Sequence, residues 1–324
     1  MTEKGTILWM TIDRHPDSLK ALIRKRLGAT GWTIHEVSYD SADALSSMPL
    51  ESVDAILMAP ARYFPTEQMD RLAQCQIIQI WSSGYDKFNI EDAHKRRIAV
   101  ANNHGANAVS VAEHAILMML GISRRIPEMH ERVLTGDWAG NDHGMTSYSL
   151  SGKTLGIVGL GNIGRLVATR AEALGMRILW ADPYVLHSPK ESWSPRDFET
   201  LLEESDYLSF HVHLNEVTRE MLNFSNIGNL KRKPFLINVS RAELISSEAL
   251  LHALNNDLVR GVGLDAHYDE PTRKSDPLLA HKNVLFSPHV AGSTVDSYND
   301  TIDACIANIQ RTISGEQPLG QILA

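Results

Sequence analysis

The stretch LGIVGLGNIG constrains the fold of this chain more than any other part of its sequence. Gly159, Gly161 and Gly164 have the G-x-G-x-x-G spacing, directly after the apolar run from Thr154 to Val158 and before a segment of helical pattern. In a strand–loop–helix unit, the first glycine makes the tight turn, the second lets the backbone approach a pyrophosphate, and the third lets the helix pack on the strand. The stretch therefore predicts a phosphate-binding loop between a buried strand and a helix.

An acidic residue after the next predicted strand supports this interpretation. The strand MRILWA ends at Asp182, where a carboxylate accepts hydrogen bonds from the ribose hydroxyls of an adenosine. An acid there repels a 2′-phosphate, so the sequence favours NAD over NADP. The alternative is an ordinary aspartate that caps a turn. The predicted cofactor-binding residues of this region are Gly159, Gly161, Asn162, Ile163, Gly164, Asp182 and Pro183. Among them, Asn162 and Ile163 would offer their amides to the anion at the helix N-terminus.

The rest of the chain alternates short apolar runs of β type with helical segments, once over the first hundred residues and again from Thr154. Such alternation predicts an α/β protein with two doubly wound parallel-sheet domains. Between the two series, residues 107–125 form one long helical pattern, so apolar that we expect it to be buried against its own domain or a partner subunit. Further helices are predicted over about 18–28, 66–74, 162–174, 197–203, 246–256 and 294–313.

Composition limits the function classes. A length of 324 residues suits two domains, and a net charge of −8 disfavours a surface for nucleic acid or anionic membranes. The two cysteines, Cys75 and Cys305, are too few for a disulfide framework or a zinc site, so we expect no metal and a reducing, cytoplasmic setting. The N-terminus lacks a signal-peptide pattern, and the longest apolar run, AILMMLGI, is too short to span a bilayer.

Three predicted strand ends in the second half carry groups suited to acid–base chemistry. Arg241 follows LINVS, Asp265 and Glu270 follow GVGL, and His289 follows VLFSP. Ligands of open α/β sheets bind at the carboxyl ends of strands, so these groups could converge on one crevice. Taken singly, each has a plainer interpretation as a surface charge, a turn or a structural histidine.

Five stretches together resemble the D-isomer-specific 2-hydroxyacid dehydrogenases, the family that includes phosphoglycerate, glyoxylate and hydroxypyruvate enzymes. They are VAEHAILMML, GIVGLGNIG, INVSRAELI, GLDAHYDEP and SPHVAGST, in the family's order and spacing. The resemblance implies that Arg241 holds the substrate carboxylate and polarises the C2 oxygen. It implies that His289 is the acid or base at that oxygen, and that Glu270 bonds the other imidazole nitrogen.

The resemblance also extends the cofactor and substrate sites. It places Asp265 by the nicotinamide amide and His211 near the adenosine, and it gives the substrate carboxylate to the amides of Ser83 and Gly84, for which a structural turn is the alternative. Val239, Ser240, Ala291 and Gly292 would line the cofactor. Two departures occur: Arg241-Ala242 replaces the usual Arg-Gly, and His213-Leu214-Asn215 replaces the usual Pro-Leu-Thr, which puts a local cofactor contact in doubt.

By the same resemblance, the NAD-binding domain, residues 104–291, is inserted into a flavodoxin-like substrate domain, residues 1–103 with 292–324. The subunits would form a homodimer. The predicted function is hydride transfer between NAD(H) and a D-2-hydroxyacid/2-oxoacid pair, with the particular substrate left open. The alternative is an NAD-sensing binding protein, like the corepressors built on the same fold. Four aromatic residues could line a pocket for a bulky acid or be core and dimer contacts: Trp81, Tyr85, Trp138 and Tyr148.

Overall fold

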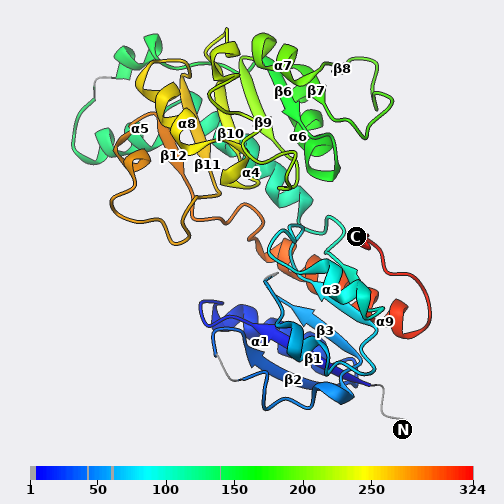
Figure 1. Ribbon diagram of the computed structural model, residues 1–324. Coiled ribbons are helices and arrows are strands. Elements are labelled where there is room, and N and C mark those ends of the chain that lie inside the picture. Colours follow the sequence, from blue (N-terminus) through cyan, green and yellow to red (C-terminus); the bar gives the residue numbers. More distant parts are fainter. Residues whose placement is uncertain (1–4, 42–43, 60–61, 139, 324) are drawn as a thin grey trace. The chain divides into compact units, whose positions relative to one another are not determined.

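The computed structural model describes residues 5–41, 44–59, 62–138 and 140–323. The chain divides into two compact units: Met1–Asn107 with Ser293–Ala324, called the first unit below, and Ala108–Gly292, called the second unit. Each unit has a parallel sheet between helices, as the ribbon of Figure 1 shows. The predicted fold class, two doubly wound parallel-sheet domains, is therefore confirmed.

The first unit contains the strands β1 (Thr6–Thr11), β2 (Thr33–Ser38), β3 (Ala55–Met58), β4 (Ile77–Ile80) and β5 (Ala99–Ala101), and the helices α1 (Asp17–Gly28), α2 (Thr66–Met69), α3 (Ile90–Lys95) and α9 (Val295–Ile313). The strand order is β2-β1-β3-β4-β5, the flavodoxin-like order. Helices α1 and α9 cover one face, where Ile23 and Ile309 share a core with Trp9. On the other face, Met69 of α2 and Ala93 of α3 pack in a second core.

The second unit contains the strands β6 (Thr154–Val158), β7 (Arg177–Ala181), β8 (Ser194–Pro195), β9 (Tyr207–Phe210), β10 (Phe235–Asn238), β11 (Gly261–Leu264) and β12 (Val284–Phe286), and the helices α4 (Ala108–Ser123), α5 (Ile126–Leu134), α6 (Asn162–Ala173), α7 (Phe198–Glu204) and α8 (Ser247–Asn255). The strand order is β12-β11-β10-β9-β6-β7-β8. Helices α4 and α6 pack on one face of the sheet and α7 and α8 on the other. Because both faces are covered, β6, β9, β10 and β11 are buried at every position.

Several elements differ from the predicted ones. The helix expected over 66–74 ends at Met69, and Arg71 turns its guanidinium to the carbonyl oxygen of Met48 and the carboxylate of Glu51. The long apolar helix ends at Ser123, because Arg125 adopts the left-handed conformation with φ 52°, a common way to stop a helix. Helices α3 and α5 and the short strand β8 were not predicted. In the described part of the chain, no helix is long and apolar enough to span a bilayer.

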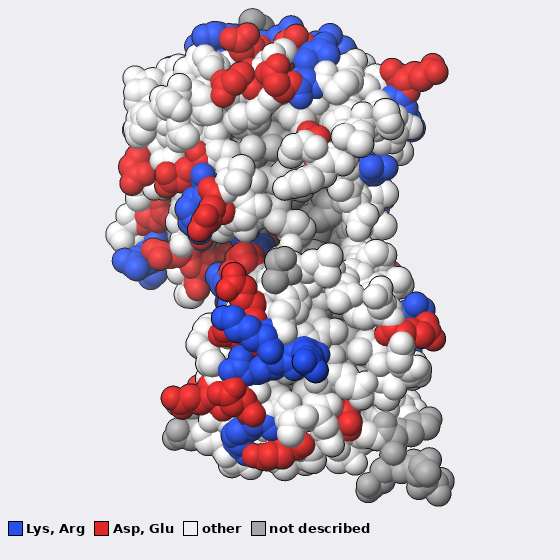
Figure 2. Space-filling view, turned by 45° about the vertical axis from the view of Figure 1, so that its right-hand side comes forward, with Lys and Arg blue, Asp and Glu red and all other residues white. Residues whose placement is uncertain are grey.

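Surface charges of both signs lie next to one another. On the face shown in Figure 2, blue and red side chains alternate between wide areas without charge. Pairs of this kind occur in each unit, for example Arg24 with Glu36 at 2.6 Å and Lys190 with Glu172 at 2.8 Å. Exposed pairs contribute about 0–1 kcal/mol each, so the buried apolar cores have the larger part in holding each unit together.

Candidate active site

Six strands of the second unit end in one row across the sheet. The register aligns their last residues in the order Ala181, Val158, Phe210, Asn238, Leu264 and Phe286. Strand order reverses between β6 and β9, which is the switch point where open α/β sheets bind ligands. The residues that come directly after the six ends are Asp182, Gly159, His211, Val239, Asp265 and Ser287. The loops that carry the predicted site residues of this unit thus all start at a single edge of the sheet.

The loop after β6 fits a pyrophosphate. Gly159 has φ +92°, and a Cβ there would lie 2.7 Å from the carbonyl oxygen of His211. A Cβ on Gly164 would lie 2.1 Å from the carbonyl oxygen of Gly159, so only glycine lets α6 approach the loop this closely. At Gly161 a Cβ would meet nothing within 4 Å, so the space beside this backbone is open. Asn162 and Ile163 begin α6, and the first amides of a helix are free to face an anion.

Asp182 is held beside this loop. Its Oδ2 accepts the amide of Leu160 at 2.8 Å, and its Oδ1 accepts the amide of Tyr184 at 2.9 Å. The aspartate therefore does cap a turn, with Pro183 exposed in it. Each carboxylate oxygen retains a second lone pair, so the same group can also accept ribose hydroxyls. Open glycine backbone, a helix N-terminus and a fixed carboxylate together suit NAD. Within the described ranges, no cluster of three or more His, Cys, Asp or Glu side chains could hold a metal ion.

His289 and Glu270 are in direct contact. Nδ1 of His289 lies 2.7 Å from Oε1 of Glu270, which also accepts the amide of His267 at 3.3 Å. The His289 side chain is 40% exposed, so its ring stays accessible while one nitrogen is held. Its backbone has φ 54°, a left-handed conformation that costs a non-glycine residue about 1 kcal/mol. The surrounding loop must supply the interactions that hold it there.

Asp265 supplies some of these interactions. Its carboxylate is fully buried and accepts the amide of Val290 at 2.9 Å, the amide of Ala291 at 2.8 Å and the hydroxyl of Ser287 at 2.5 Å. The carboxylate therefore fixes the turn on both sides of His289. Ala291 is buried beneath this turn, and Gly292 is the last residue of the second unit. The contact of Asp265 with the nicotinamide amide stays a prediction.

The loop after β10 presents Arg241. Ser240 donates its hydroxyl to the carbonyl oxygen of Phe210 at 2.8 Å, and Asn238 donates its side-chain amide to the carbonyl oxygen of Arg241 at 2.7 Å. Val239 between them is buried. The peptide of Arg241 is thus fixed, and its guanidinium donates to the carbonyl oxygen of Ser240 at 2.9 Å. Because β10 and β11 pair in register, this loop and the Asp265 loop leave neighbouring strands.

His211 forms part of the wall of the glycine loop. Its Nε2 lies 2.8 Å from the hydroxyl of Ser209, and burial lowers its pKa to about 3, so the ring is neutral at physiological pH. The stretch His213-Leu214-Asn215, which departs from the family's usual Pro-Leu-Thr, follows directly. Its Asn215 side chain accepts the amides of Val217 and Thr218 at 2.9 and 3.0 Å. Asn215 therefore holds a local turn.

In the first unit, the loop after β4 carries Ser83 and Gly84. The hydroxyl of Ser83 lies 2.6 Å from Oδ1 of Asn107, and the side-chain amide of Asn102 donates to the carbonyl oxygen of Ser83 at 3.0 Å. The hydroxyl of Ser82 donates to the carbonyl oxygen of Gly84 at 2.7 Å. The loop is therefore held from several sides. The role of its amides in binding a substrate carboxylate stays a prediction.

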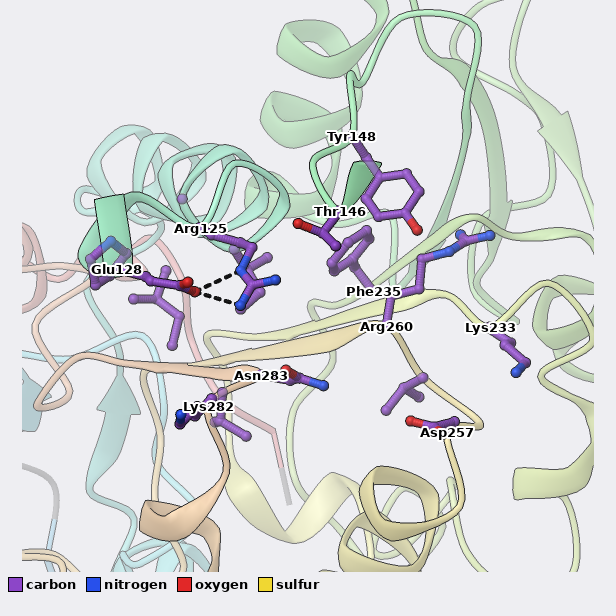
Figure 3. A pocket seen from close by; sticks show the side chains of 16 residues that line it. Arg125, Glu128, Thr146, Tyr148, Lys233, Phe235, Asp257, Arg260, Lys282 and Asn283 are labelled. Atoms are coloured by element: carbon purple, nitrogen blue, oxygen red, sulfur yellow. Dashed lines mark hydrogen bonds and ion pairs between the residues drawn. The ribbon is translucent and has the colours of Figure 1, made fainter. Parts of the chain in front are cut away.

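A cavity of about 410 Å³ lies at the opposite edge of the second unit's sheet, at the amino ends of β10, β11 and β12 (Figure 3). Tyr148 and Phe235 line it with Arg125 and Arg260. Arg241, Glu270 and His289 are not among its lining residues. Tyr148 therefore packs far from the acid–base pair, with its ring centroid 5.5 Å from that of Phe235.

The sequence alone predicted no function for three polar residues of this region, His114, His267 and Ser287. His114 of α4 contacts Ser287, and Ser287 contacts Asp265. His267 places its Nε2 2.8 Å from the carbonyl oxygen of Ser287. All three residues lie inside stretches that resemble the family, but no spacing rule joins a helix residue to a loop 173 positions later.

Comparison with known proteins agrees with this geometry. Residues 116–291 match the family model "D-isomer specific 2-hydroxyacid dehydrogenase, NAD binding domain". The chain is 33% identical over 276 residues to a glyoxylate reductase of Thermococcus litoralis, covering 83% of each protein. It is 30% identical to a D-3-phosphoglycerate dehydrogenase of Methanocaldococcus jannaschii, covering 93% of this chain and 56% of that protein. A crystal structure of a glyoxylate reductase from Paecilomyes thermophila superposes with a TM-score of 0.83 at 26% identity, covering 99% of both chains.

The matched family model and these relatives agree on one chemistry. They support hydride transfer with NAD(H), and they give no support to the alternative of an NAD-sensing corepressor. The chain belongs to the D-isomer specific 2-hydroxyacid dehydrogenase family, and it is an NAD-dependent oxidoreductase acting on a 2-hydroxyacid/2-oxoacid pair.

Proposed function

We propose that the protein reduces a small 2-oxoacid of the glyoxylate type, with NADH as hydride donor. The observation that carries the proposal is the 2.7 Å contact between Nδ1 of His289 and Oε1 of Glu270, at the edge of the sheet that also carries Arg241. A substrate of this size is favoured because relatives named glyoxylate reductase match the chain over most of their length.

In the proposed mechanism, His289 is the general acid. With Nδ1 held by Glu270, the ring nitrogen Nε2 is the one that gives a proton to the C2 oxygen of the 2-oxoacid. Glu270 accepts the Nδ1 hydrogen throughout, which fixes the tautomer and stabilises the protonated ring before transfer. In the reverse direction the same Nε2 accepts the hydroxyl proton.

Binding and orientation of the substrate fall to Arg241. A planar guanidinium can bond two oxygens at once, so it can hold the substrate carboxylate and draw electron density from the C2 oxygen. The amides of Ser83 and Gly84 would take the other carboxylate oxygen. Bound NADH supplies the hydride that converts the C2 carbonyl to an alcohol. Asp182 and the loop from Gly159 to Gly164 would hold the adenosine and pyrophosphate ends.

The proposal is tested by a panel of substrates. Oxidation of NADH and of NADPH would be measured against glyoxylate, hydroxypyruvate, phosphohydroxypyruvate, pyruvate and a branched 2-oxoacid. We expect the highest kcat/KM with glyoxylate or hydroxypyruvate, and a preference for NADH, because Asp182 repels a 2′-phosphate. Tight NADH binding without turnover of any of these acids would contradict the proposed substrate class.

The protein is further proposed to form a homodimer. Large apolar side chains are exposed along one segment of the second unit, the described residues between Val109 and Met145, which include residues of α4, of helix α5 and of the chain after it. They are Val109, Leu117, Leu120, Ile126, Val133, Leu134, Trp138 and Met145, with Trp138 84% and Met145 88% exposed. Exposed large apolar side chains in such number along one segment favour a protein interface. A second copy of the chain, packed through the same segment, would bury it.

The oligomeric state can be measured by light scattering. We expect a particle of twice the 36.0 kDa chain mass, and a shift to the chain mass for Leu117→Arg, which places a charge in the apolar segment. Leu186→Arg is the matched control, because Leu186 is also exposed but lies outside the segment. A wild-type protein that remains monomeric at micromolar concentration would refute the dimer.

We further propose that the protein is located in the cytoplasm. Both cysteines are buried and free, and burial raises the pKa of each thiol, that of Cys75 and that of Cys305, to about 12. Such thiols are protonated and unreactive, so they neither form a disulfide nor require an oxidising compartment. This chemistry is compatible with a reducing environment.

A further inference from the structure

A chain of hydrogen bonds connects helix α4 with the loop that carries His289. Nε2 of His114 lies 2.8 Å from the hydroxyl oxygen of Ser287, and this hydroxyl donates to Oδ1 of Asp265 at 2.5 Å. The Asp265 carboxylate in turn accepts the two amides that follow His289. The chain thus begins on a helix that packs on β10, β11 and β12, and it ends on the backbone of the acid–base loop.

The direction of each bond follows from the donors available. Backbone amides can only donate, so the Asp265 carboxylate is an acceptor on both oxygens. A serine hydroxyl has one hydrogen, and that of Ser287 is given to Asp265. The Ser287 oxygen must therefore accept from His114, whose Nε2 carries a hydrogen. His114 is 15% exposed in its side chain and Asp265 is fully buried, so water competes little with these bonds.

His289 lies between two points fixed by this chain. On its N-terminal side, the carbonyl oxygen of Ser287 accepts the amide of His289 at 3.0 Å and Nε2 of His267 at 2.8 Å. On its C-terminal side, the amide of Val290 is held by Asp265. His289 itself has the unfavourable φ of 54°. The anchors on both sides oppose its relaxation to an ordinary backbone conformation.

We propose that His114 and Ser287 are positioning residues for the acid–base histidine: their hydrogen-bond chain through Asp265 keeps the His289 ring in contact with Glu270. The inference rests on the proposed role of His289, because positioning affects turnover only if this ring transfers the proton. Loss of the Ser287 hydroxyl would free the loop, lengthen the Nδ1–Glu270 contact and leave fewer molecules with a correctly placed ring. Substrate binding would change little, and NADH binding would change only through Asp265, Ala291 and Gly292, which are predicted to contact the cofactor.

The test uses the full-length protein and two readouts. For Ser287→Ala we expect kcat to fall about tenfold, with KM for the 2-oxoacid unchanged and a smaller change in the Kd for NADH. In proton NMR of the protein without cofactor, the His289 Nδ1–H bonded to Glu270 should give a downfield signal, assigned by its loss in His289→Gln. This signal should broaden or vanish in Ser287→Ala through exchange with water.

Conservative and control variants separate positioning from general damage. Ser287→Thr keeps a hydroxyl, and His114→Gln keeps an N–H donor near the position of Nε2, so both should retain the signal and most of kcat, whereas His114→Leu should behave like Ser287→Ala. Ser205→Ala is the matched control, because Ser205 is also buried and its hydroxyl donates to the carbonyl oxygen of Leu201 at 2.6 Å, away from the site. It should leave kcat and the signal unchanged.

The outcomes discriminate between the inference and the proposed function. An unchanged signal in both Ser287→Ala and His114→Leu overturns the positioning role, whatever happens to kcat. A lost signal with normal kcat supports the positioning role and overturns the acid–base role of His289 instead. If Ser287→Ala does not fold, the pair His114→Gln and His114→Leu decides the question in the same way.

Discussion

Replacing His289 by alanine is expected to lower kcat by about 10³-fold while leaving the Kd for NADH nearly unchanged. A positioned general acid contributes 10²- to 10⁴-fold to a proton transfer, which corresponds to roughly 4 kcal/mol at the middle of that range. Nδ1 of the His289 ring lies 2.7 Å from Oε1 of Glu270, and a water molecule cannot replace an acid that is fixed in this way. Steady-state kinetics give kcat, and quenching of tryptophan fluorescence gives the Kd.

Two further measurements make this result specific. Added imidazole should partly restore the turnover of His289→Ala, because a small acid can enter the space left by the ring. His252→Ala removes a ring on α8 whose Nδ1 lies 3.3 Å from the side-chain amide nitrogen of Asn256, and it should retain normal kcat. Wild-type turnover in His289→Ala would refute the proposed mechanism.

Replacing Arg241 by alanine should lower kcat/KM by a similar factor, about 10³. In this case KM should rise as well as kcat fall. Two charge-assisted hydrogen bonds of about 2 kcal/mol each are lost, and together they correspond to about 4 kcal/mol. The bond to the substrate carboxylate acts in the ground state and raises KM, whereas polarisation of the C2 oxygen acts in the transition state and lowers kcat. Steady-state kinetics over a range of glyoxylate concentrations separate the two effects.

The geometry of the guanidinium can be tested by Arg241→Lys. Lysine keeps the charge but cannot form the planar two-point contact, so we expect it to recover only part of kcat/KM. Arg260→Ala is the matched control, because Arg260 leaves the other edge of the same sheet and lies over the ring of Tyr148. If Arg241→Ala behaves like this control, Arg241 does not bind the substrate.

Much of the second unit could be predicted from local patterns. The glycine spacing after β6 and the acid after β7 depend on a backbone geometry that few sequences satisfy, so they fix strand, loop and helix together. Because parallel strands end at one edge, the placement of Asp265 and of the loop that carries Arg241 at that edge followed from the strand pattern alone.

The parts that could not be predicted depend on contacts between distant segments. The helix expected over 66–74 has suitable residues, yet Arg71 finds carbonyl and carboxylate partners outside it, and the chain turns towards β4. In the same way, nothing in the apolar pattern of α4 indicates that His114 would meet Ser287, since a histidine on a buried helix is usually a core residue. Tertiary partners decide both cases, and a single sequence does not show them.

The division of the chain also affects how it folds during synthesis. The second unit is one continuous segment, Ala108–Gly292, and it can fold as soon as it leaves the ribosome. The first unit cannot, because Ile302, Cys305 and Ile309 of α9 complete the core against Ile7 and Trp9. At roughly 5–20 residues per second, the N-terminal strands wait about 10–40 s for that helix. During this interval α1 alone covers this face of the N-terminal sheet, and the apolar side chains that α9 later buries are exposed. There the nascent chain is most prone to aggregation and most in need of a chaperone.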